Sequence, residues 1–387
     1  MLRVLTLSTL YPDALRPDFG PFVELQTRGL AAHPDVEVRV MVPWGRPPMF
    51  GRLTDRYRAL DDLPWTDHRH GVTAYRLPFM HLPIVGARLD AQSLARSQRR
   101  ALKTLHADFP FDVIDAEFFW PDGPAAIALG RELDVPVSIK ARGADIHYWG
   151  KNRATAAQVR AAGQAADGLL AVSAALKADM VALGMPEERI AVHYTGIDRG
   201  LFHVRDRAAA KGALGISGPL LVSVGALIER KRHAIVIEAV KQCPNATLVI
   251  IGKGPERAAL ERRAASLGNR VRFLESQPHD VIADWLAAAD AMVLMSASEG
   301  LANAWIEALA SGTPVIISNV GGAREVLDRP EAGVLAKADP ASVADAISQV
   351  LKRDADRHAV AATVAHFSWE ANTAQLYDHL KAVAARR

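Results

Sequence analysis

The chain has 387 residues, half of them hydrophobic and about a quarter charged, and its net charge is +3. The single cysteine, Cys243, excludes an internal disulfide, and no Cys/His cluster has metal-ligand spacing. Scattered basic residues without a recognised motif argue against nucleic-acid binding. No apolar run approaches the roughly 20 residues that a membrane-spanning helix needs. The single cysteine fits a cytoplasmic, reducing location. Because the N-terminal run lacks a cleavage site, we expect a strand there.

The first half alternates short apolar runs with helical patterns. The runs predicted to be strands cover residues 4–8, 36–42, 72–77, 113–116, 135–141 and 168–173. The patterns predicted to be helices cover residues 22–32, 91–108, 123–133 and 174–183. This alternation predicts an α/β fold with an open, mostly parallel sheet covered on both faces. Ligands of such sheets bind outside the carboxyl ends of the strands.

A long loop follows the first predicted strand. It contains Tyr11 and ends at Gly20-Pro21, just before a predicted helix. Glycine allows a backbone to approach a ligand closely, and proline suits a first helical turn. A flexible surface loop is the alternative, but a loop this long in a compact domain is usually functional, so we favour ligand binding.

Residues 44–90 mix apolar side chains, prolines and arginines. The helix predicted next carries four basic residues on one face: Arg96, Arg99, Arg100 and Lys103. One interpretation is a solvated helix face. The other is a surface that contacts a membrane or a lipid-linked acceptor.

Two polar clusters stand at the ends of predicted strands. Glu117 lies in the first, and Arg142, Asp145 and His147 lie in the second. Arginine is always charged and cannot act as a base, so we expect Arg142 to stabilise a phosphate or an acceptor group. Tyr11, Glu117, Asp145 and His147 are candidates for the acceptor side, although an isolated histidine is more often structural.

The second half repeats the α/β pattern. A predicted strand over residues 220–225 ends at Gly225, and Arg230 and Lys231 precede the helix predicted over 234–241. A strand, a glycine, basic residues and a helix in this order favour binding of an anionic phosphate; an exposed basic turn is the alternative. The next strand, over 248–251, ends at Gly252, but a lone Gly-x-Gly is weak evidence.

The most informative stretch is residues 296–312, which follow a buried apolar run. Glu299 stands in a turn, and Glu307 is an isolated acid within a predicted apolar helix. Free backbone amides near the helix start would face a phosphate while the two carboxylates accept hydrogen bonds from hydroxyls. The residues of this turn are Gly300, Leu301, Ala302 and Asn303. The alternative is a solvated Glu299 and a Glu307 paired with an arginine.

Glu299, seven residues, Glu307 and the following Ala-Leu-Ala-Ser-Gly-Thr-Pro-Val resemble the donor-site signature of the retaining glycosyltransferases of family 4. The loop before Gly20 and the stretch 195–202 also resemble this family, the latter its bridge between domains. The family pattern Gly-Arg-Leu, three residues, Lys-Gly corresponds to Gly225-Ala226-Leu227 and Lys231-Arg232. The chain departs from the family at Ala226, where arginine is usual, and at Arg142, where histidine is usual.

The resemblance implies a GT-B fold of two Rossmann-like domains facing each other across a cleft. The N-terminal domain (1–202) would bind the acceptor and the second (203–365) a UDP- or GDP-linked sugar. Residues 203–218, which are charged and end in Gly215 to Gly218, are predicted to be the linker, and a C-terminal helix (366–387) would return to the first domain. The activity implied is retaining transfer of the sugar to a hydroxyl of a glycan or lipid-linked acceptor in cell-envelope polysaccharide or glycolipid synthesis.

The resemblance also implies roles for individual residues. Lys231, with Arg230 or Arg232, would neutralise the donor diphosphate together with the helix start at Ala302 and Asn303, and we favour Arg230. Gly20, Gly225 and Gly252 would lie beside the donor. Glu299 would hold sugar hydroxyls and stabilise positive charge at the anomeric carbon, while Glu307 would hold the ribose. No metal and no other cofactor are expected, and the N-terminal domain would contact the inner face of the cytoplasmic membrane.

Three other functions remain open from the sequence. One is a nucleotide-sugar epimerase or phosphorylase on the same scaffold, and another is an inactive nucleotide-binding partner subunit. An NAD-dependent dehydrogenase suits the α/β pattern, but no Gly-x-Gly-x-x-Gly follows the first strand.

Overall fold

The structure is a computed structural model that describes residues 1–48, 55–82, 86–353 and 355–386. It divides into two compact units, which we call unit 1 (Met1–Gly196 with Trp369–Arg387) and unit 2 (Ile197–Ser368). The boundaries expected at residues 202 and 365 lie a few residues from these divisions. Within the apolar stretch 44–90, residues 49–54 and 83–85 lie outside the described residues.

Unit 1 is built on an eight-stranded sheet with the order β3-β4-β2-β1-β5-β6-β7-β8. Its strands are β1 (Leu2–Leu7), β2 (Val36–Arg46), β3 (Thr66–Arg69), β4 (Val72–Met80), β5 (Val113–Ala116), β6 (Val137–Ala141), β7 (Gly168–Ala171) and β8 (Ile190–Val192). Among the strands that the structure describes in this sheet, only β3 pairs antiparallel, with β4. Buried β-branched and leucine side chains fill β1 and β5, as a sheet covered on both faces requires.

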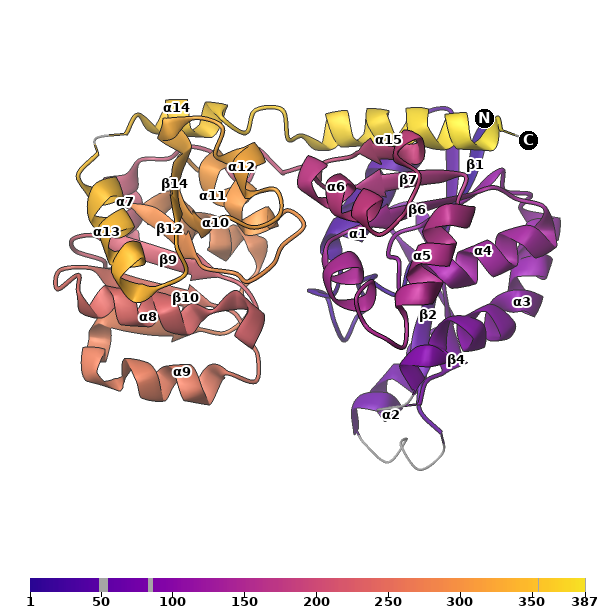
Figure 1. Ribbon diagram of the computed structural model, residues 1–387, viewed down its shortest axis with the longest axis horizontal. Coiled ribbons are helices and arrows are strands. Elements are labelled where there is room, and N and C mark those ends of the chain that lie inside the picture. The colour runs from indigo at the N-terminus through magenta and orange to yellow at the C-terminus, as the bar shows by residue number, and fades with distance from the viewer. Residues whose placement is uncertain (49–54, 83–85, 354, 387) are drawn as a thin grey trace. The chain divides into compact units, whose positions relative to one another are not determined.

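Helices cover both faces of this sheet. They are α1 (Pro21–Ala31), α2 (Asp55–Asp61), α3 (Asp90–Asp108), α4 (Asp122–Leu133), α5 (Ala156–Ala165), α6 (Ala174–Ala182) and α15 (Trp369–Ala384). Helices α1 and α15 lie together on one face, and α3 and α4 pack side by side on the other (Figure 1). Leu376, Leu380 and Val383 of α15 are buried against the strands. The C-terminal helix therefore belongs to the first domain, as predicted.

Unit 2 contains a six-stranded sheet with the order β11-β10-β9-β12-β13-β14, and all its recorded pairings are parallel. Its strands are β9 (Leu220–Val224), β10 (Thr247–Ile251), β11 (Val271–Leu274), β12 (Ala291–Leu294), β13 (Val315–Ser318) and β14 (Gly333–Ala336). Its helices are α7 (Arg207–Ala213), α8 (His233–Lys241), α9 (Arg257–Ala264), α10 (His279–Ala288), α11 (Asn303–Ala310), α12 (Ala323–Val326), α13 (Pro340–Leu351) and α14 (Arg357–Ala362). Helices α8, α9 and α13 share one core with the sheet, whereas α10 and α11 pack together (Figure 1).

The segment 203–218, expected to be a linker, is instead part of unit 2. It contains α7, which packs against α10. Lys211 Nζ lies 2.5 Å from Asp290 Oδ2, and Arg207 Nη1 lies 3.1 Å from the other carboxylate oxygen. The prediction was wrong because the basic residues that suggested a solvated linker pair with an acid of the domain itself.

Candidate active site

The main charged cluster of unit 2 lies where the connections of the sheet change direction. Strands β9 and β12 are neighbours, and the chain leaves β9 toward β10 but leaves β12 toward β13. Such a switch point is where parallel α/β sheets bind ligands. The turn after β9 supplies Arg230 and Lys231, and the loop after β12 supplies Glu299.

Glu299 holds both cations. Lys231 Nζ lies 2.6 Å from Glu299 Oε1, and Arg230 Nη1 lies 3.2 Å from Oε2. Burial alone raises the pKa of Glu299, but the charges of Lys231 and Arg230 outweigh it and hold the pKa below its ordinary value. The carboxylate is therefore ionised at neutral pH. The Arg230 side chain is still 36% exposed, so a ligand from solvent can reach this cluster.

Backbone contacts fix the two loops to each other. The Ala297 amide donates to the Arg230 carbonyl at 2.7 Å, and the Arg230 guanidinium donates to the Ser298 carbonyl. Gly321, with φ of +50°, supports Glu299 from below, because a Cβ at this position would lie 2.0 Å from the Glu299 carbonyl oxygen. The glycine pair Gly321-Gly322, three residues after the end of β13, was the available signal in the sequence for a close backbone approach.

The remaining donor-side residues line the same loops. A Cβ on Gly252 would lie 2.0 Å from the Gly225 carbonyl oxygen, so these two strand ends pack backbone to backbone. Sequence reasoning missed His233, which is buried with Nδ1 3.1 Å from Ser223 Oγ. Burial lowers the pKa of His233 to about 4, so it is neutral and holds the turn that carries Lys231.

Helix α11 carries the second acid. Leu301 and Ala302 are buried, the helix begins at Asn303, and Glu307 lies on its second turn. Burial raises the pKa of Glu307 to about 7. Within the described ranges its one recorded ion-pair partner is His279, with Nε2 at 4.0 Å. The alternative expectation of an arginine partner is therefore wrong for these residues, and Glu307 is left available to a hydrogen-bond donor.

The predicted residues of unit 1 form a closed cluster. The Arg142 guanidinium pairs with the Glu117 carboxylate, Nε donates to the Glu117 carbonyl at 2.9 Å, and the group lies over the Phe22 ring. The side chains are 7% and 0% exposed. Burial raises the pKa of Glu117, but Arg142 and Lys140 outweigh it, so the pKa lies below its usual value.

A buried polar network extends this pair, and sequence reasoning did not single it out. Gln26 donates to Glu117 and accepts from Lys140 Nζ, which also lies 2.8 Å from His193 Nδ1. His193 Nε2 donates to the Asn372 carbonyl of α15. Burial lowers the pKa of Lys140 to about 7. A lysine within the apolar strand β6 was the only signal in the sequence.

The other acceptor-side candidates also have partners within the protein. The Asp145 carboxylate accepts from the amides of Arg142 and Gly143 and so shapes the turn after β6. His147 Nε2 lies 2.8 Å from Asp179. Tyr11 is 2% exposed, and burial raises the pKa of its phenol. Gly20, with φ of +74°, caps α1 where a Cβ would lie 2.7 Å from the Leu10 carbonyl oxygen.

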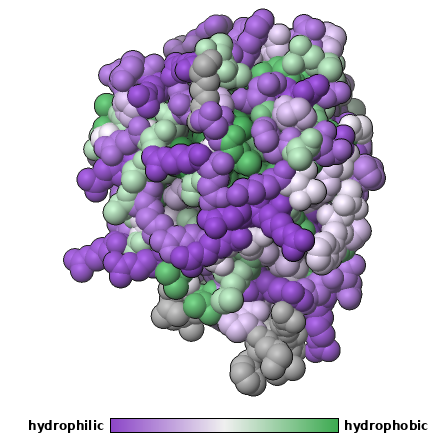
Figure 2. All heavy atoms as spheres, turned by 90° about the vertical axis from the view of Figure 1, so that its right-hand side faces the viewer, coloured by the Kyte–Doolittle hydropathy of each residue, from purple (hydrophilic) through white to green (hydrophobic). Residues whose placement is uncertain are grey.

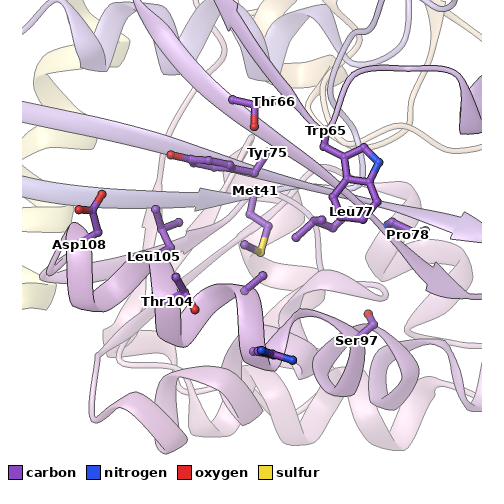
Figure 3. A pocket seen from close by; sticks show the side chains of 12 residues that line it. Met41, Trp65, Thr66, Tyr75, Leu77, Pro78, Ser97, Thr104, Leu105 and Asp108 are labelled. Atoms are coloured by element: carbon purple, nitrogen blue, oxygen red, sulfur yellow. The ribbon is translucent and has the colours of Figure 1, made fainter.

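Unit 1 also contains an apolar cavity of about 820 Å³ between its sheet and α3. Met41 and Tyr75 come from the strands, Leu105 and Thr104 face them from α3, and Trp65 stands at one end (Figure 3). A neighbouring cavity of about 420 Å³ shares Ser97 with it. Three exposed hydrophobic side chains line the two cavities: Trp65, Met80 and Leu89.

Basic side chains of α3 surround these cavities. Arg100 lines the larger and Arg96 the smaller, whereas Arg99 and Lys103 pair with Glu132. The face of unit 1 that carries α3 is mostly hydrophilic, with small hydrophobic patches between the polar side chains (Figure 2). None of the described helices is long and apolar enough to cross a membrane, and the described residues contain no group of three or more His, Cys, Asp or Glu placed to hold a metal ion.

Comparison with known families explains this arrangement. The model of glycosyl transferases group 1 matches residues 205–366, and that of glycosyltransferase family 4 matches residues 22–201. The chain belongs to the family 4 glycosyltransferases. It is therefore a glycosyltransferase, and the two family models together cover most of both units.

Two similar proteins illustrate the relationship. TuaC of Bacillus subtilis, named as a teichuronic acid biosynthesis glycosyltransferase, is 28% identical over 359 residues, which are 90% of this chain and 89% of TuaC. The N-acetyl-alpha-D-glucosaminyl L-malate synthase of Bacillus anthracis is 28% identical over 73% of this glycosyltransferase and 74% of its own length.

Solved structures support the fold. Sucrose-phosphate synthase from Thermosynechococcus elongatus superposes with a TM-score of 0.82 at 20% identity over all of both chains. HepE from Anabaena in complex with UDP gives 0.76 at 19% identity, over 99% of this chain and all of the other. The predicted GT-B class, with two Rossmann-like domains, is confirmed.

Proposed function

We propose that this glycosyltransferase moves a sugar from a nucleoside-diphosphate sugar to a hydroxyl of a glycan or lipid-linked acceptor, with retention at the anomeric carbon and without a metal ion. The observation that carries the proposal is the cluster of Lys231, Arg230 and Glu299 at the switch point of unit 2. The donor diphosphate would replace Glu299 as the ion-pair partner of Lys231 and Arg230. Glu299 would then be released to accept hydrogen bonds from the sugar hydroxyls.

The chemistry follows from these charges. The bond between the anomeric carbon and the diphosphate oxygen breaks, and the acceptor oxygen bonds to the same face of the sugar. The acceptor proton passes to the departing phosphate oxygen. Lys231, Arg230 and the start of α11 stabilise negative charge on the leaving group, and Glu299 stabilises positive charge on the sugar. Glu307 accepts from the ribose hydroxyls.

A nucleotide screen tests the donor. Ligands that bind only the folded protein raise its melting temperature, so we expect UDP- or GDP-sugars, together with the matching free nucleotide, to raise it. The shift should be smaller in Glu307→Ala and unchanged in Glu325→Ala. Stabilisation by NAD alone would refute the proposal.

Product analysis separates the transferase from its rivals. Transfer that needs an added acceptor and yields a retained linkage is expected. Sugar rearranged or released without an acceptor would instead indicate an epimerase or a phosphorylase, and nucleotide binding without any product an inactive subunit. Activity should survive EDTA; a loss that magnesium restores would contradict metal independence. The name of TuaC favours a polysaccharide acceptor of the cell envelope.

We also propose that unit 1 contacts an anionic membrane and holds the apolar chain of an anionic lipid in the cavity beneath α3. The cavity is apolar, and Arg96 and Arg100 beside it complement a lipid phosphate. Flotation with phosphatidylglycerol vesicles should recover the wild type, but less of Arg96→Gln/Arg100→Gln or the cavity-filling Ala101→Trp. Arg131→Gln on α4 is the matched charge control. Equal recovery with phosphatidylcholine vesicles would contradict the role of charge.

A further inference from the structure

Another cavity, of about 450 Å³, lies in unit 2 where β12, β13 and β14 end. Three cationic and three uncharged polar side chains line it: Arg232, Arg324, Lys337, Ser296, Ser318 and Asn319. We call it the Arg232 pocket. It opens at the same edge of the sheet as the site of Lys231 and Glu299, which is the edge where parallel sheets bind their ligands.

Few partners are recorded for the cations of the Arg232 pocket in the described part of the chain. Within the described part of the chain, no side-chain hydrogen bond or ion pair is recorded for Arg232 or Arg324. Lys337 interacts with Asp339, but that carboxylate is already bonded to Ser342 at the start of α13. Like charges around one cavity repel each other unless an anion lies between them.

Arg232 reaches the pocket from an unfavourable backbone conformation. Its φ of 52° and ψ of 37° are left-handed, directly before α8. The other two non-glycine residues with positive φ in the described chain are His70 and Asp134, and both types tolerate this region well. Strain at a residue with a Cβ is typical of functional sites. Here it places a guanidinium in the pocket.

The wall of the pocket continues into the loop that carries Glu299. Ser296, three residues before Glu299, lines the pocket, and its buried hydroxyl has no recorded hydrogen-bond partner among the described residues. Ser318 Oγ donates to the Ser296 carbonyl at 2.5 Å, which ties the ends of β12 and β13 together. A group in the pocket and a sugar on Glu299 would therefore touch the same short segment.

We propose that the Arg232 pocket binds an anionic substituent, a carboxylate or a phosphate, of a substrate held at Glu299. This inference rests on the proposed function. Guanidinium groups match the paired oxygens of both anions. The anion has two sources: the carboxylate of a donor sugar of the hexuronic acid class, or a phosphate on the acceptor. The donor diphosphate remains at Lys231 and Arg230.

The test compares a charged and a neutral donor that share one nucleotide. Dissociation constants of UDP-glucose and UDP-glucuronic acid, or of the corresponding GDP-sugars, are measured for the wild type, Arg324→Gln and Lys337→Gln, with Arg262→Gln on the exposed side of α9 as the control. For a donor carboxylate, the wild type should bind the uronic acid donor at least about tenfold tighter, each pocket variant should lose most of that preference, and free nucleotide should bind all four proteins equally.

A second titration uses inorganic phosphate in the presence of the neutral donor. If the anion is a phosphate on the acceptor, inorganic phosphate should bind the wild type and the control but not the pocket variants. In that case the wild type should bind the charged and the neutral donor equally well. If nucleotide binds but the pocket variants change neither the preference between the donors nor the binding of inorganic phosphate, the inference is overturned. If no nucleotide binds, the proposed function fails, and the phosphate titration still decides whether the pocket holds an anion.

Discussion

The charged clusters of the two units have similar residues but different surroundings. In unit 1, Arg142 pairs with a Glu117 that is wholly buried, Gln26 donates to Glu117, and Lys140 in turn donates to Gln26. In unit 2, Glu299 also pairs with two cations, but the Arg230 side chain is 36% exposed. The first cluster is satisfied within the protein, whereas a ligand can enter the second.

The two clusters therefore differ in role: the cluster of unit 1 stabilises the fold, whereas the cluster of unit 2 can bind a ligand. A buried ion pair whose hydrogen bonds are complete has little to gain from a substrate, and removing one partner leaves an uncompensated charge. The cluster of unit 1 therefore fixes the ends of β5 and β6 to each other. The cluster of unit 2 can exchange Glu299 for a diphosphate because the ligand brings charge of the same sign.

The largest effect is expected from Glu117→Ala. It leaves Arg142 buried without a counter-charge and should lower the free energy of unfolding by about 3–5 kcal/mol. Glu299→Ala should lower it by less, about 1–3 kcal/mol, because Arg230 can turn to solvent and only the Lys231 ammonium is left largely buried without its partner. Chemical denaturation measures both, with Glu132→Ala as a surface control. Equal losses for Glu117 and Glu299 would remove the distinction between the clusters.

Lys231→Ala should lower kcat about 100–1000-fold, the usual loss when one preorganised charge that faces a leaving group is removed. The protein should stay folded, because Arg230 still pairs with Glu299 when Lys231 is removed. Steady-state kinetics and a melting curve check both points, and Lys241→Ala at the end of α8 is the control. A variant with near-normal turnover would exclude contact between Lys231 and the diphosphate.

Much of this architecture could be predicted, because the spacing of apolar residues and the charged residues at strand ends are both visible in a short stretch of sequence. The run over residues 248–251 is apolar throughout, and the run over 113–116 is apolar except for Asp115, so both were predicted to be buried strands. Glu299, Lys231 and Glu307 stood out as charges at strand ends or in an apolar helix. Lys140 stood out only as a lysine in an apolar strand, and the network that it forms with His193 could not be predicted, since it depends on Gln26 and on α15, far away in sequence. The role of residues 203–218 was missed for the same reason, because Arg207 and Lys211 pair with Asp290, which is distant in sequence.

Glu307 should make stability and nucleotide affinity depend on pH in opposite directions. Its folded pKa of about 7 lies above the ordinary 4.5. The folded state therefore binds the proton more tightly, and the free energy of unfolding should fall as pH rises from about 4.5 to 7. Glu307→Gln should be more stable than the wild type by about 1–3 kcal/mol at pH 8 and no more stable at pH 4.5.

Donor binding should respond to the same proton. Ribose hydroxyls donate to the carboxylate, so nucleotide affinity of the wild type should rise as pH increases from 6 to 8, and this rise should vanish in Glu307→Gln. Calorimetric titration at three pH values measures it. An identical pH profile in both proteins would remove Glu307 from the ribose site.

The smallest expected change in the free energy of unfolding concerns Arg232. It tests whether this residue is held in a strained backbone conformation for binding a ligand. Arg232 occupies a left-handed conformation at the position where the family pattern has glycine. Arg232→Gly should therefore raise the free energy of unfolding by about 0.5–1 kcal/mol, since relief of the Cβ strain exceeds the added flexibility of the unfolded chain.

Arg232→Ala keeps the strain and removes the charge, so it separates the two contributions. If both variants gain the same stability, repulsion among the cations, rather than backbone strain, accounts for the gain. If the glycine variant is less stable than the wild type, the guanidinium already has a stabilising role in the empty pocket, and the backbone conformation is not held there for a substrate.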